Sequence, residues 1–72
     1  MQRYTPEEKE AFDSALLDLF SDNRPRSTAG IGIGLLRATR YQYSATAVSS
    51  YVHDMIDSRV LEDKGFGTYA IS

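Results

Sequence analysis

Cysteine is absent from this 72-residue sequence. The absence excludes a disulfide framework, a thiolate zinc site and a cysteine nucleophile, and it fits a reducing compartment. A single histidine, His53, leaves no set of histidines for a metal site. We therefore expect a protein with no metal and no cofactor, located inside the cell in the cytoplasm.

Long hydrophobic runs are absent as well. The longest weakly polar stretch, Ala29 to Leu36, has eight residues, three of them glycines. A membrane-spanning helix needs ~20 apolar residues. The first residues, Met-Gln-Arg-Tyr, are not followed by the apolar stretch of a secretory signal. We expect neither a membrane segment nor a signal peptide.

Acidic residues are missing from the middle of the chain. No Asp or Glu occurs from Asn23 to His53. The positive charges of this stretch come from four arginines: Arg24, Arg26, Arg37 and Arg40. Residues 1–22, 23–53 and 54–72 therefore have net charges of −4, +4 and −2. A basic segment inside an acidic protein indicates that one face meets an anion, and nucleic acid is the commonest large anion.

The composition is that of a folded domain. Hydrophobic residues make up 42% of the sequence and charged residues 25%, which distinguishes the chain from a disordered tail. The length predicts a single domain over residues 1–72. A domain this small buries only ~60% of the surface that its unfolded chain exposes. Its core is therefore small, and a second subunit or a ligand would add stability.

The first predicted helix starts at Thr5-Pro6-Glu7-Glu8. Thr5 can cap the helix, Pro6 suits its first position, and Glu8 stands three residues after the cap, as a capping box requires. Apolar residues then recur at helical spacing: Phe12, Ala15, Leu16, Leu19 and Phe20. Asp22-Asn23-Arg24-Pro25 ends the pattern. The pattern predicts a helix of about fifteen residues, roughly four turns.

The next segment, residues 27–40, is rich in glycine. We expect a helix that begins between Thr28 and Gly34 and ends near Thr39, although each glycine in a helix interior costs up to ~1 kcal/mol relative to alanine. The alternation over Gly30 to Gly34 also fits a short strand. The spacing of these glycines does not match a dinucleotide or nucleotide phosphate loop, so close helix packing is the favoured reason for them.

A third helix is predicted after a turn at Arg40-Tyr41-Gln42-Tyr43, with Ser44 as its cap. Apolar residues at helical spacing are expected to face inward: Ala45, Val48, Val52, Met55 and Ile56. Small or uncharged residues are expected on the opposite face: Thr46, Ala47, Ser49, Ser50 and His53. Val60-Leu61 then begins a strand, Glu62 to Gly65 forms a polar turn, and Phe66 to Ile71 returns as a second strand of a hairpin.

The order of helix, helix, turn, helix and hairpin resembles the winged helix-turn-helix family, most clearly over residues 44–71. The inward-facing third helix leads into Arg59-Val60-Leu61, a charged loop and the glycine-containing segment Gly65 to Ile71. These match the family's recognition helix, a strand that starts with an aliphatic pair, and a wing that returns through an aromatic residue. The resemblance implies a small α+β fold of three helices followed by a C-terminal two-stranded β-hairpin wing.

The resemblance also implies that residues 44–58 read double-stranded DNA in the major groove. Polar side chains would hydrogen-bond to base edges or phosphates: Thr46, Ser49, Ser50 and His53. Ala47 would contact a thymine methyl group. Basic and aromatic side chains would meet the DNA backbone or a minor groove: Arg24, Arg26, Arg37, Arg40, Tyr41 and Tyr43. The implied function is transcription regulation, with two copies on a two-fold site binding more tightly than one, and a chain of this size suits a phage, virus or plasmid.

Two other interpretations stay open at this stage. Arg37 and Arg40 can pair with the acidic first helix, which would leave the third helix as an ordinary solvated face. The chain can also be a winged-helix protein-interaction module or an inhibitor of a host protein, because the recognition helix has no basic residue before Arg59 and the wing is net acidic. An enzyme is not expected, since Ser49 or Ser50 with His53 and Asp57 on one helix would lack an oxyanion site and a cleft.

Overall fold

A computed structural model describes residues 4–72, so Met1, Gln2 and Arg3 lie outside the described part. The fold is a small α+β arrangement of three helices and a three-stranded antiparallel sheet. In chain order the elements are α1 (Pro6–Leu19), β1 (Arg26–Ser27), α2 (Thr28–Ala38), α3 (Ala45–Asp57), β2 (Leu61–Gly65) and β3 (Thr68–Ile71). Three helices and a C-terminal hairpin are thus confirmed, and the added strand β1 turns the expected two-stranded hairpin into a three-stranded sheet.

The start of α1 is the predicted capping box. The Glu8 amide donates a 3.1 Å hydrogen bond to the Thr5 hydroxyl, and the Thr5 amide donates a 2.8 Å bond to the Glu8 carboxylate. Pro6 occupies the first helical position. The two bonds satisfy backbone donors that a helix start leaves without partners.

Helix α2 contains all three glycines of the Gly30 to Gly34 segment, so the strand alternative for this segment is wrong. Ser27 caps the helix by accepting a 3.1 Å hydrogen bond from the Gly30 amide. A Cβ on Gly34 would lie 2.7 Å from Leu19 Cδ1 of α1. Glycine at this position therefore lets α1 and α2 approach closely, which supports packing as its role.

Helix α3 is capped by Ser44 as predicted, with the Ala47 amide donating to its hydroxyl at 3.1 Å. The buried face of the helix differs from the predicted one: Ala47, Val48, Tyr51, Val52 and Met55 are buried. Ala45 is exposed and Ile56 is half-buried. Helix α3 is thus rotated about its axis relative to the prediction, because the Tyr51 ring enters the core, where its hydroxyl has a hydrogen-bond partner. A pattern of aliphatic residues alone does not predict this rotation.

The sheet has the strand order β1-β3-β2. β1 pairs with β3 through Arg26 and Tyr69, and β2 pairs with β3 through Leu61 and Ile71. Residues Glu62 to Gly65 belong to strand β2 and do not form the predicted turn. The turn is made by Phe66 and Gly67. Charged residues are common on an exposed edge strand such as β2, because they oppose pairing with another sheet edge.

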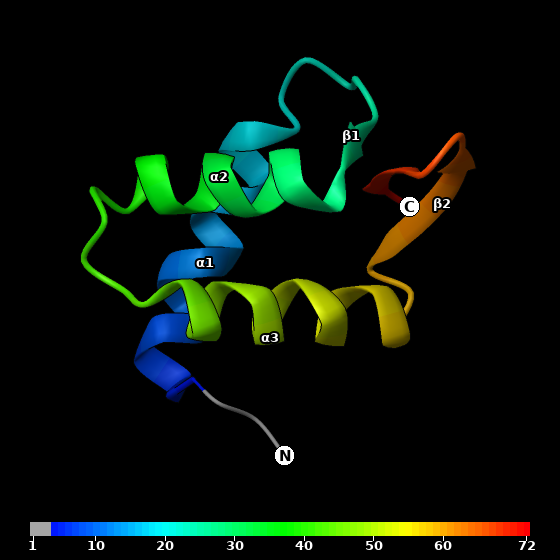
Figure 1. The fold of residues 1–72 in the computed structure, drawn as a ribbon. Coiled ribbons are helices and arrows are strands. Elements are labelled where there is room, and N and C mark those ends of the chain that lie inside the picture. The colour runs from blue at the N-terminus through cyan, green and yellow to red at the C-terminus, as the bar shows by residue number, and fades with distance from the viewer. Residues whose placement is uncertain (1–3) are drawn as a thin grey trace.

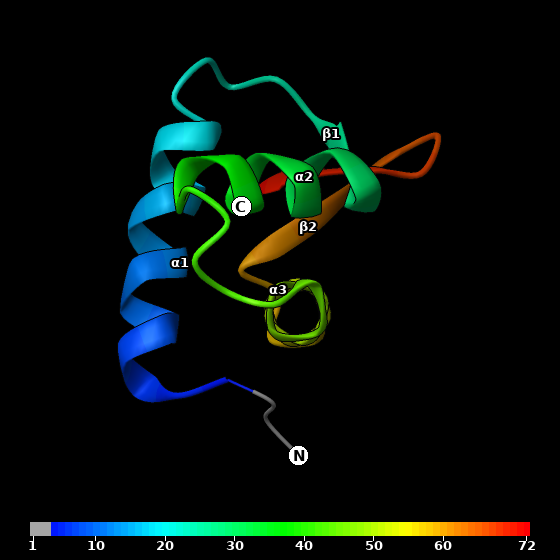
Figure 2. The ribbon, with the colours of Figure 1, turned by 60° about the vertical axis from the view of Figure 1, so that its left-hand side comes forward.

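The core lies where the three helices meet the sheet. The largest fully buried side chains come from the three helices and β2: Phe12, Ile31, Leu35, Val48, Tyr51 and Leu61. In Figure 1, α2 and α3 lie one above the other with α1 behind them, and the hairpin stands beside the end of α3. Figure 2 shows α3 end-on while α2 runs across the view, so these two helices cross.

Candidate nucleic-acid interface

The exposed face of α3 brings together the four polar residues that the sequence singled out. Thr46, Ser49 and His53 are exposed and Ser50 is half-buried. Together with Ala45 and Asp54 they line a shallow surface hollow of about 490 Å³. The residues of the hollow near the start of α3 have small, uncharged side chains. Hydroxyl and imidazole groups can donate hydrogen bonds to bases or phosphates, and they can accept hydrogen bonds from bases.

Ala47 does not belong to this face. Its residual exposure is 2% because it packs into the core beside Val48. The expected contact between Ala47 and a thymine methyl group is therefore wrong. The cause is the rotation of α3 that buries the Tyr51 ring.

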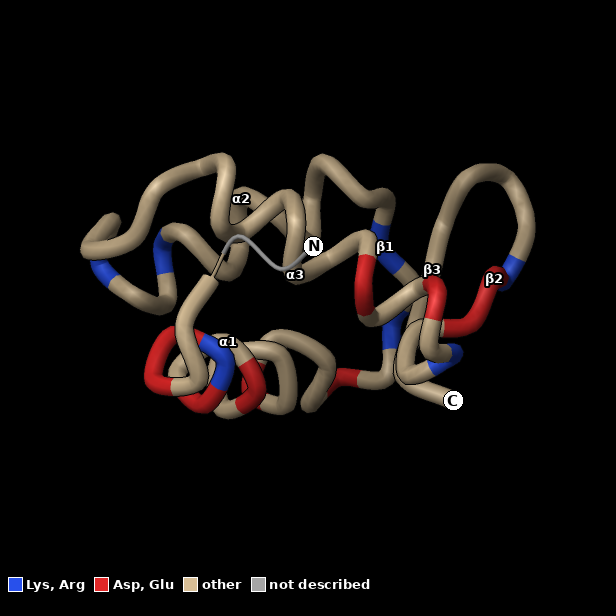
Figure 3. Tube along the Cα trace, turned by 90° about the horizontal axis from the view of Figure 1, so that it is seen from below, with Lys and Arg blue, Asp and Glu red and all other residues tan. Residues whose placement is uncertain are grey.

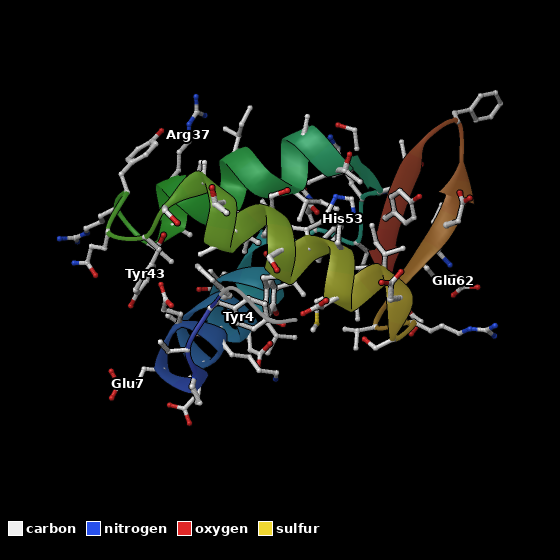
Figure 4. All side chains as sticks on the ribbon, turned by 60° about the horizontal axis from the view of Figure 1, so that its bottom comes forward. Tyr4, Glu7, Arg37, Tyr43, His53 and Glu62 are labelled. Carbon is white, nitrogen blue, oxygen red and sulfur yellow. The ribbon has the colours of Figure 1, made fainter. Side chains whose placement is uncertain are left out.

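Arg37 and Arg40 stand at the end of α2 and in the turn that follows it, and both are exposed. Neither guanidinium forms an ion pair with any carboxylate in residues 4–72. Figure 4 shows Arg37 pointing outward from the body of the protein. Figure 3 shows the acidic residues gathered along α1 and basic residues beyond the end of α2. The alternative in which these arginines pair with the first helix is thus not what the structure shows.

Arg26 is held in place by the protein itself. Its guanidinium donates hydrogen bonds of 3.1 and 2.9 Å to the Asp22 carboxylate and one of 3.2 Å to the Arg24 carbonyl. The same group lies over the Phe20 ring, 5.4 Å from its centroid. The hydrogen bonds from Arg26 and the Arg24 amide lower the pKa of Asp22 to about 2, and Asp22 raises the pKa of Arg26. Arg26 therefore has a structural role, and its contact with DNA stays a prediction.

The four arginines do not form one patch. Arg24 and Arg26 precede α2, whereas Arg37 lies in its last turn and Arg40 follows the helix. Helix α2 has eleven residues, a length of about 16 Å at 1.5 Å per residue, and most of this length separates the two pairs. Arg24 is exposed, but it stands at the end of α2 opposite to the turn. Arg40 lies in the turn that leads into α3, and Arg37 lies in the last turn of α2 before it.

The two tyrosines of the turn differ in their surroundings. Tyr41 is 65% exposed. Tyr43 is half-buried, and its ring packs edge-on against Phe12 with a centroid distance of 5.2 Å. Tyr43 therefore anchors the turn to the core, and Tyr41 is the residue free to meet a ligand.

Two tyrosine–aspartate hydrogen bonds are not predicted by the sequence. The Tyr4 hydroxyl donates to Asp54 at 2.5 Å, and the Tyr51 hydroxyl donates to Asp13. Asp54 is thus a structural partner of the N-terminal segment. Burial and the bond to Asp54 raise the pKa of Tyr4 to about 12, and burial and the bond to Asp13 raise that of Tyr51.

Asp13 also accepts a 2.9 Å hydrogen bond from Lys9. Burial favours its protonated form, but the hydrogen bonds from Tyr51 and Lys9 outweigh burial and lower its pKa below the ordinary value. The signal available in the sequence was a carboxylate directly after the core residue Phe12, and the structure shows that this carboxylate faces α3. These bonds join the N-terminal segment and α1 to α3, and they fix the orientation of α3 on the core.

Other site types find little support in the described part of the chain. No cluster of three or more metal-ligating side chains occurs in residues 4–72. None of the helices described has both the length and the apolarity for crossing a membrane. Comparisons with protein-family models, curated proteins and solved structures find no match for this chain. The geometry and charge of the α3 face therefore carry the evidence for function.

Proposed function

We propose that this protein is a winged helix-turn-helix transcriptional regulator that binds duplex DNA with the N-terminal half of α3. The element order supports this proposal. A short strand precedes α2 and pairs with the hairpin, so the sheet ties the start of α2 to the wing β2–β3. Helices α2 and α3 cross and are joined by a short turn, as in helix-turn-helix units (Figure 2).

The observation that carries the proposal is the chemistry at the start of α3. Thr46, Ser49 and Ser50 present hydroxyl groups there, and no carboxylate precedes Asp54 on the helix. Arg37 and Arg40 supply two positive charges that form no ion pair with a carboxylate of the described residues. The positive end of the α3 dipole adds to them. Phosphates flanking a major groove would be attracted to this end of the helix.

The carboxylates of α3 and β2 limit where DNA can bind. Asp54 and Asp57 lie in the second half of α3, and Glu62 and Asp63 are exposed on β2. These carboxylates would repel phosphates, so the duplex sits over the first turns of α3 and away from the wing. Docking of this kind explains how an acidic wing is compatible with DNA binding.

The test is fluorescence anisotropy with a mixed-sequence duplex, titrated at several salt concentrations. Arg37→Ala and Arg40→Ala should weaken binding to all sequences and reduce the slope of log K against log salt by about 1 each. Arg59→Ala is the matched control, because Arg59 is an exposed arginine beside the acidic end of α3. Binding that is insensitive to salt, or equally reduced by all three changes, would contradict the proposal.

Protein binding through the acidic surface is the second candidate, and the exposed carboxylates of α1 and β2 favour it. Charge reversal at Glu7 and Glu10, or at Glu62 and Asp63, should disrupt such a complex. Glu8 is unsuitable for this test because its carboxylate closes the helix cap. The charge reversals should leave the affinity for DNA unchanged or raise it, whereas Arg37→Ala and Arg40→Ala should lower it. Comparing the two sets of variants therefore distinguishes DNA binding from protein binding.

A further inference from the structure

Phe66 breaks a local rule of hairpin formation. It is fully exposed at the tip of the β2–β3 hairpin, which stands clear of the helices in Figure 1. Phe66 and Gly67 form a two-residue turn with φ values of 54° and 73°. Turns with positive φ at both positions favour Asn, Asp or Gly, and a bulky residue is strained there. An aromatic ring that is strained and unburied indicates a contact made outside the chain.

Helices α2 and α3 form a shallow apolar groove of about 330 Å³. Small residues line it, namely Ala29, Gly32, Ala45 and Ser49, and Ile33 stands half-exposed along it. A Cβ on Gly32 would come no closer than 3.9 Å to Val48 Cγ1, so helix packing does not require glycine there. A cavity of ~150 Å³ already holds benzene, and the groove therefore has room for a phenyl ring.

We infer that the protein self-associates by inserting Phe66 of one copy into the α2–α3 groove of a second copy. In a two-fold dimer each copy supplies one ring and one groove, so two equivalent contacts form. Each contact buries an aromatic ring that is otherwise exposed to water, together with part of the exposed Ile33 side chain. Both apolar surfaces are thereby covered in a single arrangement.

The charges around the two surfaces are complementary. Glu62 and Asp63 are exposed on the strand that leads to Phe66, and Lys64 on the same strand pairs with Glu62 at 3.4 Å, so the three charges sum to −1. No carboxylate in the described part of the chain lines the groove, and Arg37 follows Ile33 by one helical turn on α2. The acidic wing of one copy therefore meets no like charge and approaches an arginine of the other. The same wing would be repelled by phosphates, which favours the groove over DNA as the site that Phe66 occupies.

Self-association also has a consequence for the α3 face. Ser49 and His53 line both the groove and the hollow assigned to DNA. A dimer formed through the groove would cover these residues, so dimerisation and DNA binding would exclude each other. This consequence alone rests on the proposed function.

Sedimentation velocity on the full chain without DNA, from micromolar to low millimolar concentration, tests the inference. We expect a reversible monomer–dimer equilibrium. Phe66→Asn removes the ring and creates the favoured Asn-Gly turn. Ala29→Glu places a carboxylate in the groove, in the first turn of α2 where an acidic side chain stabilises a helix. Both variants should fold, and each should raise the dimer dissociation constant roughly tenfold or more.

Two controls make the result specific. Leu17→Asn removes an exposed apolar side chain of α1 outside both surfaces and should leave the equilibrium unchanged. An equimolar mixture of the Phe66→Asn and Ala29→Glu variants should recover part of the affinity, because the mixed dimer keeps one intact ring and groove. A chain that stays monomeric throughout, or a dimer that Phe66→Asn leaves intact, would overturn the inference. Because the experiment contains no DNA, its result tests self-association independently of DNA binding.

Discussion

The Tyr51 hydroxyl donates a hydrogen bond to the Asp13 carboxylate and so joins α3 to α1. The Tyr51 ring is fully buried and packs against the rings of Tyr4 and Phe12 at centroid distances of 5.6 and 5.1 Å. A buried hydroxyl needs a partner, because leaving it without one costs about 1–3 kcal/mol. Asp13 supplies that partner while keeping part of its carboxylate in solvent.

The first prediction concerns this bond. Tyr51→Phe should lower the free energy of unfolding by about 1–2 kcal/mol, since it removes a hydrogen bond to a charged but partly solvated group. Urea denaturation at neutral pH measures the change. Tyr43→Phe is the matched control, because no residue in the described part bonds to its hydroxyl, and it should change stability by less than ~0.5 kcal/mol. Equal effects of the two changes would contradict a special role for the Asp13 bond.

Acid should destabilise the fold through two aspartates. The pKa of Asp22 is lowered to about 2, and that of Asp13 is also below its ordinary value. A carboxyl group with a lowered pKa in the folded state stabilises the fold above its unfolded pKa of about 3.9, and this contribution is lost as pH falls through the folded value. The urea midpoint should therefore drop from about pH 5 towards pH 2. Asp13→Asn should make this drop shallower, and an unchanged pH profile would exclude Asp13 as a source.

Two tyrosines should resist ionisation at alkaline pH. The pKa of Tyr4 is raised to about 12 and that of Tyr51 is raised as well, so both should stay protonated at pH 10, the ordinary pKa of a tyrosine. Groups with a raised pKa contribute stability below the unfolded value that is lost as pH rises through the folded one. Tyrosinate absorbance should show a late phase that disappears in Tyr4→Phe. A single transition near pH 10 in the folded protein would refute the prediction.

Two glycines of α2 should respond differently to the same change. Gly32→Ala should raise the free energy of unfolding by about 0.5–1 kcal/mol, because alanine suits a helix interior and the new methyl group meets Val48 at an ordinary distance. Gly34→Ala should fall short of that gain, because its Cβ would lie 2.7 Å from Leu19 Cδ1. Adding Leu19→Ala should remove the difference between the glycine sites, as a double-mutant cycle in urea would measure.

His53→Ala should change which sequences are bound without changing the salt dependence. In the proposed complex His53, on the exposed face of α3, meets base edges, whereas Arg37 and Arg40 meet the phosphates that set the salt dependence. Selection of binding sites from a random duplex pool, compared for the wild-type and variant chains, measures the preference. Ser14→Ala on the outer side of α1 serves as a control. An unaltered preference would mean that His53 does not contact bases.

Local signals in the sequence determined the helices well. The starts of α1 and α3 depend on hydrogen bonds between residues three apart, Thr5 with Glu8 and Ser44 with Ala47. Such bonds need no tertiary structure, so their motifs are readable in the chain. Periodicity also placed Ser49 and His53 together on one exposed face, as the structure confirms. The basic middle third was equally visible, because charge order is a property of the sequence alone.

Only the tertiary structure decided the features that depend on residues far apart in the chain. Strand β1 exists because Arg26 meets Tyr69, and the rotation of α3 that buries Ala47 follows from the entry of Tyr51 into the core beside Asp13. The packing of the whole fold also decided which arginines stay unpaired. Burial and long-range pairing depend on the other elements, whereas capping and helical spacing depend on the nearest turn.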